Sequence, residues 1–299
     1  APGALPRRNI PNFAFPERVG STLAAMWQRK QWLDEHHDSA PPAPVEDCDL
    51  DTAGAAIDAG LAVVTQRVKQ EGLLPDEAGW LTPDQAEALL SAYRIPTPRS
   101  GLAPSVEDAL ALAETVGYPV VLKAALPRVT HKTDVGGVMV NIRTPAELRE
   151  AFSGLVDRIR ARMPSLSIVE GVYVQHMVYG VAELIVGVVR DPQFGPLVMA
   201  GVGGTQVELK REVAFELAPL TRQQAGDLLG RTAAGRLLAG FRGAPPADRA
   251  TAADTVLRLA QIALDWPQVA EIEINPLIVM PQGEGAYAVD VRVRLEVPG

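Results

Sequence analysis

Residues 119–142 read PVVLKAALPRVTHKTDVGGVMVNI, and the pattern of this stretch decides the predicted fold. The apolar run over 119–125 is typical of a buried strand, and the segment 138–142 predicts a second strand after a glycine-containing loop. Lys123 stands in the first strand, where burying an uncompensated ammonium would cost several kcal/mol. We therefore expect an anionic group to meet Lys123. The alternative is a lysine that reaches solvent from the strand end or pairs with a carboxylate.

The loop between these two strands carries polar donors and small residues. His131 and Lys132 are followed by Gly136 and Gly137. Such a loop can fold over phosphate groups with its backbone amides pointing inward. Its sequence is not a Walker A motif, and nowhere does a GxGxxG open a helix after a strand as in a dinucleotide-binding fold. The sequence thus predicts a phosphate site of another class.

Helix-capping signals lie on both sides of the two strands. The segment 82–85 (Thr-Pro-Asp-Gln) combines an N-cap, a first-turn proline and a capping-box glutamine, and it predicts a helix to about Tyr93. Ser105 opens a second helix that ends at Gly117. The segment 144–147 (Thr-Pro-Ala-Glu) predicts a third helix after the second strand.

The second half of the chain is predicted to be rich in strands. We expect strands over 172–178, 182–189 and 196–204, a helical region over about 221–264, and a closing hairpin of 271–279 with 286–295 across PQGEG. Helices and strands that alternate in two successive groups indicate an α+β architecture of two α/β lobes with a cleft between them.

The first forty-odd residues differ from the rest in composition. A proline-rich start precedes a predicted helix from Glu17 to about Trp32, and a linker-like stretch follows it. We therefore expect a boundary near residue 45, a linker helix region over 46–80 and the main domain over 81–299. Within that domain the first lobe is expected to cover about 81–172 and the second about 173–299.

Composition limits the classes of partner. The net charge of −8 argues against a protein that binds nucleic acid by general attraction to phosphates. No apolar run approaches the roughly 20 residues that span a bilayer, and the first residues lack the apolar segment of a signal peptide. We therefore expect a cytoplasmic protein with no membrane or nucleic-acid partner. Cys48 is the single cysteine, which excludes an intrachain disulfide and a thiolate metal cluster.

The closing hairpin carries oxygen ligands suited to a metal ion. Glu273 and Asn275 are alternate residues of one predicted strand and share a face, and Asp290 lies on its partner strand. Carboxylate and amide oxygens, completed by water and phosphate, are what Mg²⁺ prefers. The alternative is a solvated sheet face with a turn-forming Asn-Pro.

Five stretches together closely resemble the ATP-grasp segment of ADP-forming acetyl-CoA and other acyl-CoA synthetases, relatives of the succinyl-CoA synthetase β subunit. They are LTPDQAEALLSAYRIPTP, GYPVVLKA, HKTDVGGV, VYVQHMVYGVAELIVGVVRDPQFGPLVMAGVGG and EIEINPLIV. The resemblance covers about residues 75–296 in matching order and implies an ATP-grasp fold. The stretch NIPNFAFPERVGSTLAAMWQRKQWL resembles the end of a preceding CoA-ligase domain, which implies that the chain is one portion of a larger fused protein.

The resemblance implies a role for each matching position in binding ATP or ADP with Mg²⁺. Lys123 would contact the α and β phosphates, and the loop over 129–137, with Lys132, would cover the phosphate chain. The other implied binding residues are Gly136 and Gly137 in the loop, Gln175, His176, Met177 and Val178 at the adenine hinge, Glu183 in the cleft, Gly201, Gly203 and Gly204 on its floor, and Asn275 and Asp290 as Mg²⁺ ligands with Glu273 beside them. At the hinge, backbone groups of His176 and Val178 would pair with the base.

His131 matches a histidine that the resemblance implies is a transient phosphate carrier between a CoA-ligase portion and ADP. A neutral imidazole is a good nucleophile near pH 7, and Lys123, Lys132 and Mg²⁺ would screen the phosphoryl oxygens. The bland alternative is a loop histidine that only donates a hydrogen bond to a phosphate. The whole system would convert acyl-CoA, ADP and phosphate to acid, CoA and ATP, with an α-subunit-like CoA-ligase portion as partner.

Two other functions remain open at this point. One is a non-catalytic, ligand-sensing region of a fused protein lysine acetyltransferase, with the acetyltransferase domain as an additional part. The other is a different ATP-grasp carboxylate ligase, although the HKTDVGGV loop favours the CoA branch.

Overall fold

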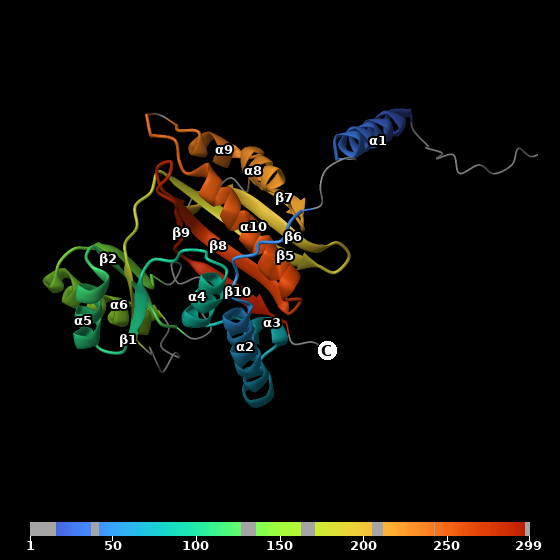
Figure 1. Ribbon diagram of the computed structural model, residues 1–299. Helices are drawn as coiled ribbons and strands as arrows, with labels where there is room; N and C mark the ends of the chain where they lie inside the picture. The colour runs from blue at the N-terminus through green and yellow to red at the C-terminus, as the bar shows by residue number, and fades with distance from the viewer. Residues whose placement is uncertain are drawn as a thin grey trace, which may run out of the picture. The chain divides into compact units, whose positions relative to one another are not determined.

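The structure is a computed structural model that describes residues 16–36, 42–126, 136–162, 171–204, 212–241 and 243–296. The chain divides into two compact units, 1–42 and 43–299, each described here by itself. The described part of the first unit is the helix α1 (Pro16–His36), which extends the helix expected from Glu17 to Trp32 by one residue at its start and four at its end (Figure 1).

The smaller of two antiparallel sheets in the second unit has the strand order β1-β4-β2-β3. Its strands are β1 (Ser100–Ala103), β2 (Val120–Ala124), β3 (Val138–Ile142) and β4 (Val172–His176). The helices α5 (Val106–Val116) and α6 (Pro145–Arg162) pack on it and share its apolar core. Ser105 caps α5 as predicted, because its hydroxyl accepts from the Asp108 N–H.

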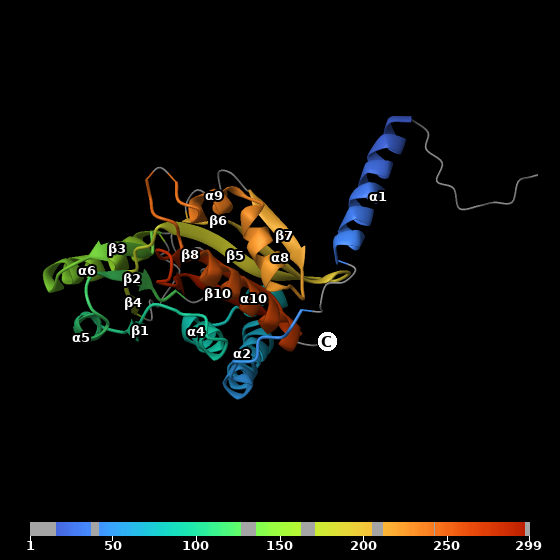
Figure 2. The same cartoon turned by 45° about the horizontal axis from the view of Figure 1, so that its top comes forward.

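The larger sheet has the strand order β10-β8-β5-β6-β7, with β9 pairing with β8. Its strands are β5 (Ala182–Asp191), β6 (Gly195–Val202), β7 (Val213–Leu217), β8 (Val269–Val279), β9 (Ala286–Ala288) and β10 (Val291–Leu295). The helices α8 (Arg222–Gly230), α9 (Ala233–Leu238) and α10 (Arg249–Asp265) cover one face of the sheet (Figures 1 and 2).

The helices before the smaller sheet belong to the core of the larger one. They are α2 (Leu50–Glu71), α3 (Pro75–Ala78) and α4 (Pro83–Ala92). Ala53 and Ile57 of α2 and Leu89 of α4 are fully buried in the same apolar cluster as the strands β5, β6 and β8. The region 46–80 is therefore part of the folded core rather than a linker, because α2 presents an apolar face to it.

Two further limits differ from those expected. The strand β4 pairs with β1 and β2, so the smaller sheet ends at His176 rather than at residue 172. The expected helical region over 221–264 is three helices, since Thr232 and Asp248 each cap a new one. The strand β7 was not predicted. It is an edge strand, and its apolar residues Phe215 and Leu217 are exposed. The alternation of buried apolar and exposed polar residues that identifies a strand in a sequence is therefore weak here.

Other local predictions are confirmed. The capping box of α4 forms, with Thr82 accepting from the Gln85 N–H and Gln85 accepting from the Thr82 N–H. The closing hairpin is present, because β8 pairs with both β9 and β10, and Asp290 lies in the short connection between those two strands. Among the described residues, no helix is both long and apolar enough to cross a bilayer.

Candidate functional site

Lys123 links the two sheets. It lies on β2 of the smaller sheet, is half-buried, and donates from Nζ to the backbone carbonyl of Val289 at 2.8 Å. Val289 stands between β9 and β10 of the larger sheet, directly before Asp290. An anionic partner was expected for this ammonium, and one of its partners in the structure is a neutral carbonyl from the opposite lobe. A phosphate oxygen would be a stronger partner, because charge-assisted hydrogen bonds are roughly twice as strong as neutral ones.

Gln175 reaches the same carbonyl from the neighbouring strand. In the register of β2 with β4, Gln175 lies opposite Val121, so its side chain shares a sheet face with that of Lys123. Its Nε2 lies 3.3 Å from the Val289 oxygen. The carbonyl of Val289 thus accepts from two side chains of the smaller sheet.

The proposed metal ligands on the larger sheet are brought together at the same place. The N–H of Asn275 donates to the Asp290 carbonyl at 2.9 Å, and the side-chain oxygen of Asn275 accepts from the Gly204 N–H at 3.1 Å. Gly204 has a φ of +73°, and a side chain there would collide with the carboxylate of Glu183. Glu183 and Asn275 therefore lie beside one glycine, and Asp290, whose carbonyl is bonded to Asn275, directly follows the residue whose carbonyl Lys123 binds.

Glu273 has a separate environment. It lies opposite Arg292 in the β8–β10 register, with its Oε1 4.0 Å from the arginine Nη1. The Arg292 guanidinium in turn stacks over the Trp80 ring, 4.7 Å from its centroid. The carboxylate of Glu273 is thus already paired with a cation, two residues along the strand from Asn275.

The donor set fits Mg²⁺ in its chemistry. Asp290 is exposed, and the Asn275 side-chain oxygen has a second lone pair beyond the one used by Gly204. Within the described ranges, no three His, Cys, Asp or Glu side chains gather as a metal cage. Mg²⁺ does not require such a cage, since it is commonly held by one or two carboxylates plus phosphate oxygens and water.

The predicted adenine hinge follows β4. The N–H groups of His176 and Met177 donate to the carbonyls of Arg99 and Pro119, both at 2.9 Å. A contact of His176 with a base through its backbone would therefore have to use the carbonyl. The His176 Nδ1 lies 2.8 Å from the Gly117 carbonyl, so this nitrogen carries the hydrogen and the ring fixes the turn before β2.

The end of the predicted phosphate loop returns to β2 beside Lys123. The carbonyl of Gly137 accepts from the Ala124 N–H at 2.8 Å, and Gly136 has a φ of +69°. His131 and Lys132 lie outside the described residues, as does most of the loop over 129–137.

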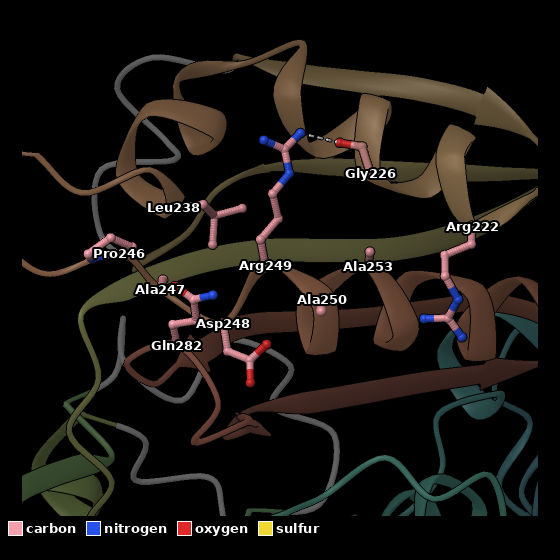
Figure 3. Close-up of a pocket in the computed structure, with 10 residues that line it drawn as sticks. All are labelled: Arg222, Gly226, Leu238, Pro246, Ala247, Asp248, Arg249, Ala250, Ala253 and Gln282. Atoms are coloured by element: carbon pink, nitrogen blue, oxygen red, sulfur yellow. Dashed lines mark hydrogen bonds between the residues drawn. The ribbon is translucent and has the colours of Figure 1, made fainter.

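The hollow drawn in Figure 3 lies away from these residues. It has a volume of about 510 Å³ at the start of α10, and none of the predicted site residues lines it. Its arginines are engaged in the fold: Arg222 pairs with Asp254 at 2.9 Å, and Arg249 donates to the Gly226 carbonyl at 2.7 Å. The two arginines of this hollow are therefore committed to contacts within the fold.

One group at the site was not found from the sequence. The carbonyl of Val289 receives both Lys123 and Gln175, yet a backbone oxygen at a valine carries no mark in the sequence. In the sequence, the nearest residue that indicated a site at this position was its neighbour Asp290.

Comparisons with known proteins show the family of the chain. Residues 72–295 match the ATP-grasp domain family. The chain is 34% identical over 287 residues to the 4-hydroxybutyrate–CoA ligase [ADP-forming] of Nitrosopumilus maritimus, which covers 96% of this chain but 39% of that protein. It is 38% identical over 215 residues to the β subunit of acetate–CoA ligase [ADP-forming] I of Pyrococcus furiosus, covering 72% of this chain and 91% of the subunit.

Solved structures give the same result. The dinucleotide forming acetyl-coenzyme A synthetase 1 of Ca. Korarchaeum cryptofilum, in complex with coenzyme A, Ca-AMPCP and HgCl+, has a TM-score of 0.70 and 38% identity over 78% of this chain and 98% of that chain. Another structure of that synthetase holds coenzyme A and Mg-AMPPCP, with its phosphohistidine segment pointing towards the nucleotide binding site; it has a TM-score of 0.64 and 36% identity over 79% of this chain and 100% of that chain. By its sequence and its fold, the chain belongs to the ATP-grasp family of ADP-forming acyl-CoA synthetases.

Proposed function

We propose that the chain binds ADP or ATP with Mg²⁺ and performs the nucleotide half of an ADP-forming acyl-CoA synthetase reaction. The whole reaction converts acyl-CoA, ADP and phosphate to acid, CoA and ATP. The observation that supports this most directly is the reach of Lys123 from one sheet to the carbonyl beside Asp290 on the other, at 2.8 Å. Lys123 of the smaller sheet thus binds the carbonyl of the peptide group that joins Val289 to Asp290, the candidate metal ligand of the larger sheet.

Lys123 would bind phosphate oxygens in place of the Val289 carbonyl. An ammonium gains more from a phosphate than from a neutral carbonyl, so the nucleotide would displace this internal contact. Asn275 and Asp290 would hold Mg²⁺, with Glu183 and Glu273 nearby, and the ion would neutralise charge on the phosphate chain.

His131 would act as the phosphate carrier. In the direction of ATP use, a ring nitrogen attacks the γ phosphorus, the bond from that phosphorus to the ADP oxygen breaks, a phosphorus–nitrogen bond forms, and ADP leaves. The role rests on the HKTDVGGV motif, since His131 is outside the described residues. Loss of acid-labile phosphorylation in His131→Ala, with nucleotide affinity retained, is the result expected. Persistence of the label on that variant would reject the carrier role.

A CoA-ligase portion would complete the reaction. The chain spans 39% of the Nitrosopumilus ligase, whereas it covers 91% of a separate β subunit, so the partner would be in the same or another chain. Alone, the chain should not make acyl-CoA. The comparisons give no support to the acetyltransferase-linked sensing role, and a cytoplasmic location stays a prediction.

The direct test is an isothermal titration of the chain with ADP and ATP, each with and without Mg²⁺. Binding that depends on Mg²⁺ with a dissociation constant in the micromolar range, about −8 kcal/mol, is the expected result. An absence of binding at millimolar nucleotide would contradict an assembled site in this chain.

A further inference from the structure

We infer that the outer edge of β7 is a self-association surface, on which a second copy of this chain adds its own β7 in antiparallel orientation. The larger sheets of the two copies would then form one continuous sheet across a two-fold axis. This surface lies outside the candidate site, so the inference does not depend on nucleotide binding.

The strand β7 is at one end of the larger sheet and pairs on one side only, with β6 (Figure 1). The other end of this sheet is covered by the chain itself. There the Val293 carbonyl of β10 accepts from the Leu81 N–H, and the Leu295 N–H donates to the Gly79 carbonyl, both at 2.9 Å. Within the described ranges, no segment is bonded in this way to the outer side of β7. An uncovered edge of this kind is a template for another strand.

The register shows which backbone groups of β7 point outward. The Ala218 N–H donates to the Pro196 carbonyl at 3.0 Å, so the even-numbered residues of this strand turn their backbone polar groups toward β6. The alternate residues Val213, Phe215 and Leu217 therefore direct their N–H and C=O groups away from the sheet. These are the groups that a further antiparallel strand would use.

The side chains of the same residues are apolar and accessible. Phe215 is 47% exposed and Leu217 is 45% exposed. They lie opposite Met199 and Leu197 of β6, on the face of the sheet that α8 and α9 leave open. The strand contains neither lysine nor proline, the residues that commonly prevent pairing at an exposed edge.

Pairing of β7 with its own copy matches side chains as well as backbone. With the two-fold axis at Phe215, this residue faces its own copy, and Val213 faces Leu217 of the other chain. Glu216, the one charged residue of the strand, faces Ala214 of the other chain rather than a second carboxylate. Aromatic and aliphatic cross-strand pairs stabilise a sheet, whereas like charges directly opposite each other destabilise it. This self-complementarity favours a second copy as the occupant.

The first test is disulfide cross-linking of the whole chain, with Cys48 replaced by serine so that one introduced thiol remains. In the proposed pairing the Cα atoms of Phe215 and its copy lie about 5.5 Å apart, which a disulfide can span. Phe215→Cys should therefore give a linked dimer on mild oxidation, detected by non-reducing electrophoresis.

The matched control is Leu217→Cys, on the same strand and nearly as exposed. Leu217 faces residue 213 of the other chain, so its own copy would be about 14 Å away along the strand. A disulfide cannot bridge that distance, and this variant should give no linked dimer.

The second test needs no introduced thiol. Sedimentation velocity of the wild-type chain over about 1–100 µM should show an equilibrium between monomer and dimer. Phe215→Lys would place two ammonium groups against each other at the axis, so it should stay monomeric. The control is Val140→Lys, because Val140 is 60% exposed on β3, an edge strand of the smaller sheet, and this variant should still dimerise.

Three results would overturn the inference. They are a wild-type chain that is monomeric at every concentration, a dimer that persists in Phe215→Lys, and equal cross-linking of Phe215→Cys and Leu217→Cys. If circular dichroism shows that Phe215→Lys does not fold, the two cysteine variants decide. Each of these results leaves the proposed function untouched, since nucleotide binding is measured separately by isothermal titration.

Discussion

At the scale of single residues, Lys123 has two competing acceptors. In the structure its ammonium binds the Val289 carbonyl at 2.8 Å, and with nucleotide it would bind phosphate. The strength of the nucleotide contact is therefore the difference between a charge-assisted bond to phosphate and a weaker bond to a peptide oxygen.

Replacement of Lys123 by alanine should raise the dissociation constant for Mg-ADP by at least about thirtyfold, near 2 kcal/mol, because the charge-assisted contact is lost. Isothermal titration measures this change. The control is Lys69→Ala, since Lys69 is exposed in the last turn of α2 and should leave the affinity unchanged. Undiminished binding by Lys123→Ala would remove Lys123 from the site.

The sequence offers candidate site residues where the chemistry resides in side chains. Asn275, Asp290 and Glu183 were expected in one cleft, and their roles stay predictions; in the structure Glu183 and Asn275 lie beside Gly204, and the Asn275 N–H donates to the Asp290 carbonyl. It does not predict the carbonyl of Val289, because every residue has a backbone oxygen. Only the strand register shows which of them faces Lys123.

At the scale of elements, one carboxylate holds two segments of the larger lobe. Asp248 caps α10 by accepting from the Thr251 N–H at 3.1 Å, and it also accepts from Gly283 at 3.2 Å and Gly285 at 3.0 Å in the turn before β9. Burial raises the pKa of Asp248, but these hydrogen bonds outweigh it, and the pKa is lowered overall.

Asp248→Ala should lower the free energy of unfolding by about 2 kcal/mol at neutral pH, because a helix cap and a turn lose their acceptor. The lowered pKa gives the pH dependence its sign. The stabilisation is fully present above the ordinary pKa of an aspartate and is lost as the pH falls through the folded-state value. Urea unfolding of the wild-type protein and Asp248→Ala, repeated from neutral pH down to strong acid, measures this difference in the free energy of unfolding. A difference that persists in strong acid would contradict this account, and exposed Asp227→Ala should behave like wild type.

Two glycine substitutions should change stability in opposite directions. A Cβ at Gly187 of β5 would lie 2.5 Å from the Ile272 carbonyl oxygen on β8, so Gly187→Ala should destabilise the protein by about 1–3 kcal/mol. A Cβ at Gly154 of α6 meets nothing within 4 Å, so Gly154→Ala should stabilise it by about 0.5–1 kcal/mol. Thermal unfolding compares the two. A stable Gly187→Ala would show that the β5–β8 spacing can widen.

Elements with local signals were the ones that the sequence predicted. The helices α4 and α5 begin at their predicted caps, because capping uses residues within one turn. Sheet membership is a long-range property. Nothing near β4 states that it pairs with β1 and β2 rather than with β5, and α2 is part of the core only because distant strands cover its apolar face.

At the scale of the whole molecule, two apolar cores are joined by a few polar contacts. One core surrounds the smaller sheet and the other surrounds the larger. Besides the Lys123 contact, Ser100 on β1 donates to the Glu87 carboxylate of α4 at 2.9 Å. Because groups from both sheets would contact the nucleotide, its binding should stabilise both cores against unfolding.

Mg-ADP at a hundred times its dissociation constant should raise the free energy of unfolding by about 2.7 kcal/mol. Hydrogen exchange followed by mass spectrometry should then show slower exchange in β2 and β4 as well as in β8. Protection confined to one sheet would show that the nucleotide contacts a single lobe. Lys123→Ala serves as the control, since the same concentration of Mg-ADP should protect its strands much less.

The peptide group of Val289 has a consequence for how occupancy could be followed. Two donors hold its oxygen in the structure, at 2.8 and 3.3 Å. A carbonyl that loses a hydrogen bond vibrates at a higher frequency. With an isotope label on this one carbonyl, its infrared band should shift to higher frequency when nucleotide binds and Lys123 moves from the carbonyl to the phosphates.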